Sequence, residues 1–136
     1  MDNIINELVK LSNNAYKGNE VPVGCIVEKD GKIISKAYNK RQKSHLTVNH
    51  AEIIAINKAQ KKLKDWRLND CTMYVSLEPC KMCKEVIRQS RISNVYYYVE
   101  SKFDNEDQKV INYNKIIDNN SELYQKLLKN FFERKR

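Results

Sequence analysis

Two kinds of apolar spacing alternate along the chain, and this alternation restricts its fold more than any other feature of the sequence. Residues 2–17 carry apolar side chains mostly three or four positions apart, which is the spacing of an amphipathic helix with one buried face. Residues 21–27 are almost continuously apolar, as expected of a strand that is buried on both faces. The Asp30–Gly31 pair then predicts a tight turn into a second strand over residues 33–38.

The alternation continues toward the end of the chain. After a polar loop at residues 39–49, the patterns predict helices over residues 50–63, 79–89 and 122–132, and strands over residues 71–77, 95–99 and 109–113. Helices and strands that alternate in this way form α/β domains in which a sheet lies between helices. We therefore expect a three-layer α/β fold.

The length of the chain agrees with that expectation. Its 136 residues are close to the ~150 of a typical domain, so we expect a single domain over residues 1–136. A chain of this size buries roughly two-thirds of its unfolded surface and needs no disulfide bonds to be stable. No apolar run reaches the ~18 residues that cross a bilayer, and the first residues do not resemble a signal peptide. We therefore expect a cytoplasmic protein without membrane segments.

The chain is basic, with 25 lysine and arginine residues against 17 acidic residues and a net charge of +8. A basic surface attracts nucleic acids and acidic membranes. The abundance of lysine, asparagine and isoleucine also fits an AT-rich genome, so the charge alone favours a nucleic-acid partner only modestly. Its placement is more specific, because the last eleven residues contain one acid, Glu133, and five bases: Lys126, Lys129, Arg134, Lys135 and Arg136.

Three sulfur and nitrogen side chains have the spacing of a metal site. Cys80 and Cys83 form a C-x-x-C pair directly after Pro79, and residues three apart on a helix share a face, so both thiols can reach one ion. Proline suits the first helical turn, and the positive end of the helix would favour the thiolate form. His50, which opens an earlier helix, supplies a third ligand. Three protein ligands leave tetrahedral zinc one open position, as a catalytic site requires.

Other interpretations of the cysteine pair are open at this point. The pair can be a redox couple, or half of a structural zinc site that Cys25 and Cys71 complete. Both of these cysteines lie in apolar runs that resemble strands, where cysteine usually serves as a small buried side chain. The pair can also be without function.

Glu52 favours the catalytic interpretation. It lies two residues after His50, and residues two apart within a helix point to different sides. Both can face one site only if His50 lies at the irregular start of the helix and Glu52 in its first turn. A glutamate in the first turn is also common because it interacts favourably with the helix dipole. Taken together, however, residues 50–52 and 79–83 resemble the H-x-E…P-C-x-x-C signature known from zinc-dependent nucleobase deaminases.

Nearly the whole chain resembles one family, the bacterial tRNA-specific adenosine deaminases. The resemblance spans residues 20–132 and rests on these segments: EVPVG (20–24), AYN (37–39), HAEI (50–53), WRL (66–68), SLEPCKMC (76–83) and FF (131–132). It implies a cytidine-deaminase-like fold, in which a five-stranded mixed sheet lies between helices, with one zinc ion per chain and assembly as a homodimer. It also implies conversion of the wobble adenosine to inosine in the anticodon loop of a tRNA, usually an arginine tRNA.

The resemblance also assigns roles to residues. His50, Cys80 and Cys83 would bind zinc, and Glu52 would transfer protons during deamination. The other assigned residues would contact the substrate: Asn39 by a hydrogen bond to the extruded nucleotide, the Ala51 main chain and Val23 at the base, and Phe131 and Phe132 beside the RNA. From position alone, Asn39 is better explained as a turn residue at the end of a strand than as a functional residue, and one phenylalanine of the pair can belong to the core.

Three segments depart from the family pattern. Residues 99–105 contain no glycine, residues 46–49 read Leu-Thr-Val-Asn, and Glu133 stands where the family commonly has arginine. These segments lie near RNA in the family, so they bear on the choice of tRNA rather than on the chemistry. The first alternative function is a deaminase of a small substrate such as guanine, cytosine or a nucleoside. The second is a non-enzymatic RNA-binding module with a structural zinc ion.

Overall fold

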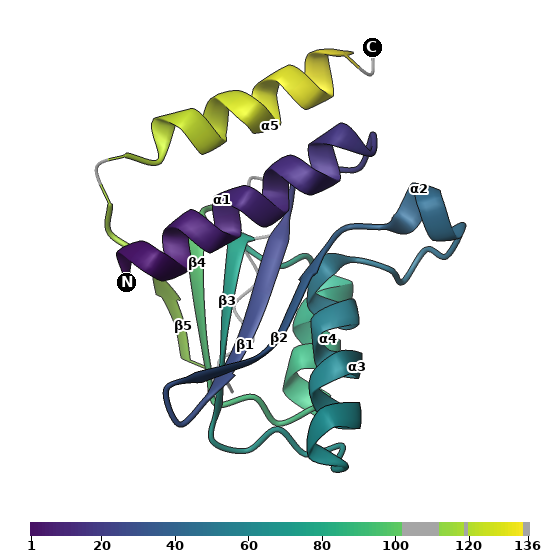
Figure 1. Cartoon of the computed structure of the whole chain (residues 1–136), viewed down its shortest axis with the longest axis vertical. Helices are drawn as coiled ribbons and strands as arrows, with labels where there is room; N and C mark the ends of the chain where they lie inside the picture. Colours follow the sequence, from purple (N-terminus) through teal and green to yellow (C-terminus); the bar gives the residue numbers. More distant parts are fainter. Residues whose placement is uncertain (102–111, 119, 135–136) are drawn as a thin grey trace.

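Helices cover both faces of one mixed β-sheet (Figure 1). The computed structural model describes residues 1–101, 112–118 and 120–134. Its elements in chain order are α1 (Asp2–Lys17), β1 (Gly24–Lys29), β2 (Lys32–Tyr38), α2 (Arg41–Ser44), α3 (Ala51–Leu63), β3 (Cys71–Leu77), α4 (Lys81–Gln89), β4 (Asn94–Val99), β5 (Asn112–Lys115) and α5 (Glu122–Arg134). Within the described ranges, no helix has the length and hydropathy of a membrane span.

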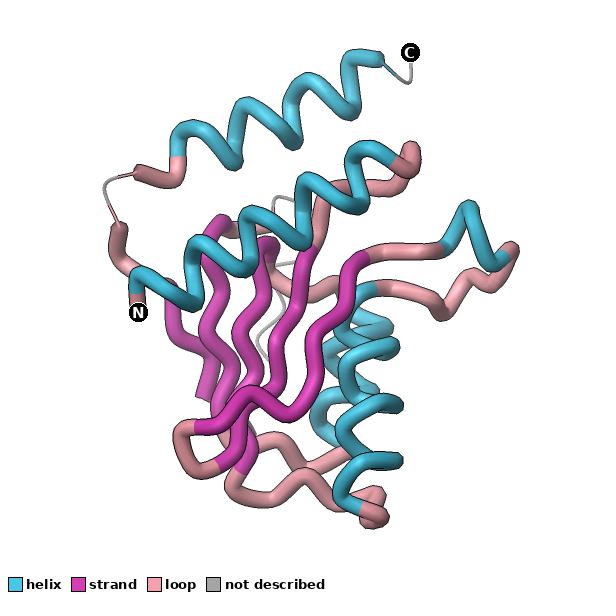
Figure 2. Tube along the Cα trace, in the orientation of Figure 1, coloured by secondary structure: helices cyan, strands magenta, loops and turns pink. Residues whose placement is uncertain are grey.

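The strands follow the order β2-β1-β3-β4-β5 across the sheet (Figure 2). β1 pairs antiparallel with β2 and β3, whereas β3, β4 and β5 run parallel to one another. Asp30 and Gly31, both at positive φ, form the turn between β1 and β2. α4 provides the long crossover that the parallel neighbours β3 and β4 require. The predicted α/β fold with a five-stranded mixed sheet between helices is therefore confirmed.

α1 and α5 lie on one face of the sheet, and α3 and α4 lie on the other (Figure 1). α1 buries Leu8 and Leu11 in a cluster with Ile26 of β1. The helix approaches the strand so closely that a Cβ atom on Gly24 would lie 2.6 Å from Leu11 Cβ. Gly24 N also donates a hydrogen bond of 3.0 Å to the buried hydroxyl of Ser76 on β3. These contacts fix α1 on the sheet.

The larger part of the core lies between the sheet and the helices α3 and α4. Its buried side chains come from both helices and from the central strands: Val27, Ala55, Ile56, Met73, Val75, Ile87 and Val95. His50 is the N-cap of α3, and Cys80, three residues after the end of β3, is the N-cap of α4. This packing brings the starts of the two helices together at one edge of the sheet.

The prediction of a loop over residues 39–49 was wrong in part, because the segment contains the short helix α2. None of the side chains of α2 is buried, so the helix leaves no apolar pattern in the sequence. It is bounded by main-chain contacts, such as the 3.0 Å hydrogen bond that Lys40 N donates to Asn49 O.

Two further boundaries differ from the prediction. Pro79 lies before α4 rather than in its first turn, because Cys80 is the N-cap and Lys81 the first helical residue. Among the described residues the last strand is Asn112–Lys115, so it includes residues 112 and 113 of the predicted strand and extends two residues further. Residues 109–111, and residues 102–105 of the segment that departs from the family pattern, lie outside the described residues.

We predict that Gly24→Ala destabilises the protein by roughly 1–3 kcal/mol, because the added methyl group would overlap Leu11 Cβ and the Leu8 carbonyl. The matched control is Gly18→Ala, whose Cβ atom would meet its nearest neighbour, Ala15 O, at an ordinary 3.5 Å. The free energy of unfolding of both variants is measured by urea titration. Equal stability of the two variants would contradict the close approach of α1 to β1.

Candidate metal centre and its cavity

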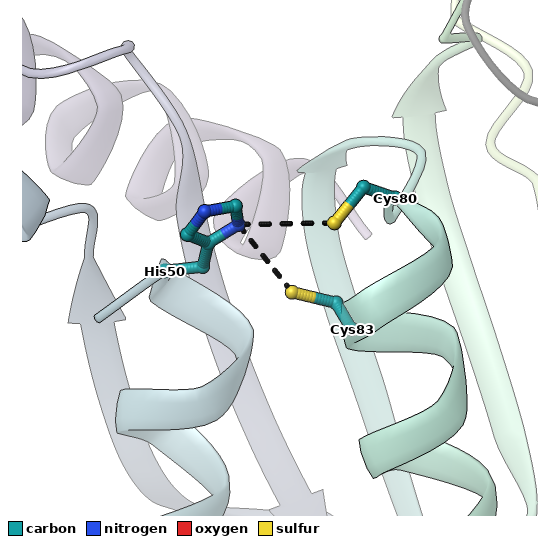
Figure 3. Close-up of side chains that lie close together, drawn as sticks. All are labelled: His50, Cys80 and Cys83. Carbon is teal, nitrogen blue, oxygen red and sulfur yellow. Dashed lines mark hydrogen bonds between the residues drawn. The ribbon is translucent and has the colours of Figure 1, made fainter. Parts of the chain in front are cut away.

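His50, Cys80 and Cys83 bring three donor atoms together at the starts of α3 and α4 (Figure 3). His50 Nδ1 lies 3.9 Å from Cys80 Sγ and 3.5 Å from Cys83 Sγ. All three donor atoms lie within 4.8 Å of one another. The structure thus places the three predicted ligands in one cluster, which we call the donor cluster.

The separations in the donor cluster fit a tetrahedral zinc ion. With a Zn–S bond of about 2.3 Å and a Zn–N bond of about 2.0 Å, a tetrahedral angle places nitrogen and sulfur about 3.5 Å apart. The observed separations of 3.5 and 3.9 Å lie close to this value. Thiolate and imidazole groups are also donors that suit zinc, and three protein donors are typical of catalytic rather than structural zinc sites.

The charges within the donor cluster also favour a cation. A hydrogen bond from Cys83, together with His50, lowers the pKa of the Cys80 thiol to about 4. The same contact, together with burial, raises the pKa of the Cys83 thiol. The Sγ atoms of Cys80 and Cys83, which lie within 4.8 Å of each other, hold one proton between them, because two adjacent thiolates would repel each other. A divalent cation removes that repulsion and allows both sulfur atoms to be ionised.

The other two cysteines do not belong to the donor cluster. Cys25 and Cys71 are fully buried in β1 and β3, among the side chains of the core. All four cysteines lie in the described part of the chain, and each is a free thiol. The geometry therefore does not support a structural zinc site completed by Cys25 and Cys71.

Glu52 lies in the first turn of α3 and lines the same cavity as His50 and Cys80. Because His50 is the N-cap, the two residues face one site although they are only two positions apart. Glu52 is 4% exposed, and burial raises the pKa of its carboxyl group to about 7. A carboxyl group with a pKa near neutrality is suited both to accept and to donate a proton.

The donor cluster opens into a cavity of about 550 Å³, within the roughly 300–1,000 Å³ typical of small-molecule sites. Its walls come from the α1–β1 connection, from the segment after β2, from the β3–α4 connection and from α5. The lining residues are Asn19, Glu20, Val21, Val23, Asn39, Arg41, Gln42, His50, Glu52, Leu77, Glu78, Cys80, Ser101, Phe131 and Phe132.

The structure places the predicted substrate residues around this cavity. Val23, Asn39, Phe131 and Phe132 line it. Ala51 is fully buried, and its main-chain N–H donates a 2.7 Å hydrogen bond to Asn39 Oδ1. Asn39 is therefore more than a turn residue, because its side chain joins the end of β2 to the start of α3. Of the phenylalanine pair, Phe131 is buried and Phe132 is 47% exposed.

Glu20, Arg41 and Gln42 also line the cavity, although the sequence assigned them no role. The Glu20 carboxylate accepts hydrogen bonds from the main-chain nitrogens of Gln42 and Lys43, at 3.0 and 2.9 Å. The signal that could have pointed to Glu20 is its place in the segment 20–24, one of those that carry the family resemblance. No pattern marked Arg41 and Gln42.

The fold and the donor cluster together define a class of α/β domains that bind a metal ion at the starts of two helices. Residues 2–99 match the cytidine and deoxycytidylate deaminase zinc-binding region. The matched range includes the donor cluster and Glu52. The chain therefore belongs to the cytidine and deoxycytidylate deaminase family.

Curated relatives of this chain act on tRNA according to their names. The tRNA-specific adenosine deaminase of Streptococcus pyogenes serotype M18 (strain MGAS8232) is 41% identical over 91 residues, which are 67% of this chain and 57% of that protein. The tRNA-specific adenosine deaminase of Bacillus subtilis (strain 168) is 38% identical over 91 residues, which are 67% and 56% of the two chains. The chain thus spans little more than half the length of these relatives.

Solved structures with this fold have more than one substrate. The guanine deaminase of Bacillus subtilis has a TM-score of 0.70 at 26% identity and covers 95% of this chain and 93% of its own. A chain from work on A-to-I editing by tRNA:A34 deaminases has a TM-score of 0.79 at 24% identity, with coverage of 85% and 98%. The likeness of the second structure shows the fold alone, which is the cytidine-deaminase-like fold.

We predict that the purified protein binds about one zinc ion per chain and that Cys80→Ser loses it, because the variant removes one of only three protein donors. The matched control is Cys71→Ala, which removes a thiol outside the donor cluster. Zinc content is measured by mass spectrometry of the metal after dialysis. Full zinc occupancy in Cys80→Ser would refute ligation by this residue.

Proposed function

We propose that this chain catalyses hydrolytic deamination of the wobble adenosine to inosine in the anticodon loop of a tRNA. The observation that carries the proposal is the common cavity of Glu52, His50 and Cys80, because it brings a buried proton-transfer group beside the donors of a metal ion. The names of the curated relatives, at 38–41% identity over two-thirds of this chain, support adenosine in tRNA as the substrate.

The proposed chemistry divides between the metal and Glu52. A zinc ion held by His50, Cys80 and Cys83 would supply Lewis acidity that makes water a stronger nucleophile. Glu52 accepts a proton from the attacking water and donates a proton to the ring nitrogen beside the carbon under attack. It then transfers the remaining proton to the departing ammonia. The neutral-range pKa of Glu52, about 7, suits a group that changes protonation state at each of these steps.

The cavity walls would orient the nucleotide. Asn39 uses its carbonyl oxygen to accept the hydrogen bond from Ala51 N, so its amide nitrogen is the group we expect to donate to the substrate. In this proposal the main chain of Ala51 acts through Asn39, while Val23 packs beside the base. Phe131 and Phe132 offer aromatic surface on α5 for the unstacked bases of an anticodon loop.

The finer parts of the proposal rest on the resemblance of the motif segments. They comprise an arginine tRNA as substrate, a homodimer, one zinc ion per chain and a cytoplasmic location. The two thiols of the donor cluster fit a reducing compartment, because their oxidation to a disulfide would remove both sulfur donors.

A guanine deaminase is the second candidate. The observation that favours it is the guanine deaminase of Bacillus subtilis, whose structure covers 95% of this chain at 26% identity. The charge of this chain modestly favours RNA instead, because a net charge of +8 attracts the phosphates of RNA, which guanine lacks.

We predict that Glu52→Gln retains zinc but lowers turnover of an anticodon stem-loop by at least about 100-fold, the usual contribution of a positioned acid–base group. Glu85→Gln is the matched control, since it neutralises an exposed carboxylate that pairs with Arg88 on the outer side of α4. Inosine formation and zinc content are measured on the same samples. Substantial inosine formation by the zinc-loaded Glu52→Gln variant would contradict the proton-transfer role.

We also predict that the enzyme prefers RNA to small substrates and that the preference depends on salt. Anticodon stem-loops, free adenosine and guanine are offered side by side, and inosine and xanthine are quantified. Between 50 and 200 mM salt, kcat/KM for the stem-loop falls at least about tenfold, because cations compete with the protein for phosphates. Faster turnover of guanine, with rates indifferent to salt, would identify the protein as a small-substrate deaminase.

A further inference from the structure

α2 stands at the mouth of the cavity without support from the hydrophobic core. None of its four residues is buried, and a helix of this length is not stable alone in water. Figure 1 shows it projecting from the body of the molecule beside the start of α3. Yet Arg41 and Gln42 of this helix form part of the cavity wall. The position of α2 therefore depends on polar contacts.

Glu20 supplies two of these polar contacts. The residue is 4% exposed, and its carboxylate oxygens accept hydrogen bonds from Gln42 N at 3.0 Å and Lys43 N at 2.9 Å. Hydrogen bonds to an ionised acceptor are stronger than those between neutral groups, and a buried carboxylate without partners is costly. Glu20 therefore ties α2 to the connection between α1 and β1, a segment 22 residues away in the sequence.

The two hydrogen bonds between Glu20 and α2, which we call the Glu20 tie, hold positive charge beside the cavity. Lys40, Arg41 and Lys43 lie within four residues of the chain, and no acid occurs between residues 31 and 51. Lys40 Nζ lies over the ring of Tyr38, 4.9 Å from its centroid. Arg41 and Lys43 are exposed, and Arg41 lines the cavity. Exposed lysine and arginine side chains beside a nucleotide cavity are suited to bind the phosphate groups of a nucleic acid.

We propose that Glu20 is a positioning residue that holds α2 beside the cavity, so that Arg41 and Lys43 bind phosphate groups flanking the target nucleotide of an RNA strand. This inference rests on the proposed function and deepens it, because it names the part of the chain that selects a polynucleotide over a free nucleoside. Glu20 acts through α2 and touches neither the reacting atoms nor the donor cluster.

The first test uses Glu20→Gln, which keeps the size of the side chain but replaces one acceptor oxygen by an amide that cannot accept from a main-chain N–H. We expect hydrogen exchange at the amides of Gln42 and Lys43 to become at least about tenfold faster, because α2 is released. Affinity for a fluorescently labelled anticodon stem-loop falls about tenfold. KM for the stem-loop rises accordingly, while kcat stays within about twofold.

Two further variants separate the effect of the Glu20 tie from the effect of the positive charge on α2. Glu7→Gln, which neutralises a partly exposed carboxylate 3.0 Å from Lys36 Nζ, is the matched control and changes neither exchange nor affinity. Arg41→Gln leaves the Glu20 tie intact, so hydrogen exchange at the Gln42 amide is unchanged. Affinity for the stem-loop falls, and the slope of log K against log salt concentration becomes smaller in magnitude by about one. The Arg41 result decides the phosphate contact even if Glu20→Gln fails to fold.

The outcomes distinguish this inference from the proposed function. Unchanged amide exchange in Glu20→Gln would overturn the positioning role of Glu20. Unchanged RNA affinity and an unchanged salt slope in Arg41→Gln would overturn the phosphate contact of Arg41. A wild-type protein that binds the stem-loop through Arg41 without forming inosine supports the inference and refutes the proposed function. A wild-type protein that does not bind the stem-loop overturns the inference, whatever small substrate it deaminates.

Discussion

The convergence of two helix starts at one edge of the sheet is the constraint on which the site depends. His50 caps α3 and Cys80 caps α4, so the donor cluster exists only while these helices begin side by side. The parallel crossover from β3 through α4 to β4 sets the position of one helix start. The hydrogen bond between Asn39 and Ala51 sets that of the other. The positive ends of both helix dipoles favour the thiolate form of the cysteines at this edge, and the thiolates in turn attract a cation.

The aromatic wall of the cavity depends on the opposite layer. Phe131 of α5 packs edge-to-face on Tyr16 of α1, with ring centroids 6.4 Å apart. Arg134 stacks over the Tyr16 ring at 4.5 Å and donates a hydrogen bond to Asn19 Oδ1. α1 packs closely against the sheet at Gly24. Through its contacts with α5, it therefore positions Phe131 and Phe132 at the cavity. The chemistry and the substrate wall thus come from different faces of one sheet.

Within each motif the site could be predicted from local geometry, whereas the pairing of His50 with cysteines 30 and 33 residues away rested on the resemblance of the two motifs to a known signature. Spacing alone brings Cys80 and Cys83 to one face, and the position of Glu52 at the start of a helix follows from that of His50. The contact of Glu20 with α2 could not be predicted, because its donors are main-chain N–H groups, which side-chain patterns do not reveal, and because α2 contains no buried side chain. The end of β5 was predicted two residues too early, since the polar run Asn112–Lys115 has no alternating pattern.

The lack of buried side chains in α2 has a consequence for how such a protein diverges over time. Substitutions in this helix leave the core intact, so the folding of the domain places few limits on what its residues are. A replacement in the donor cluster, by contrast, removes one of the three groups that would hold the metal ion. Related proteins can thus differ in the helix at the mouth of the cavity while they keep the same metal ligands and the same reaction. A single fold can in this way act on both free bases and nucleic acids.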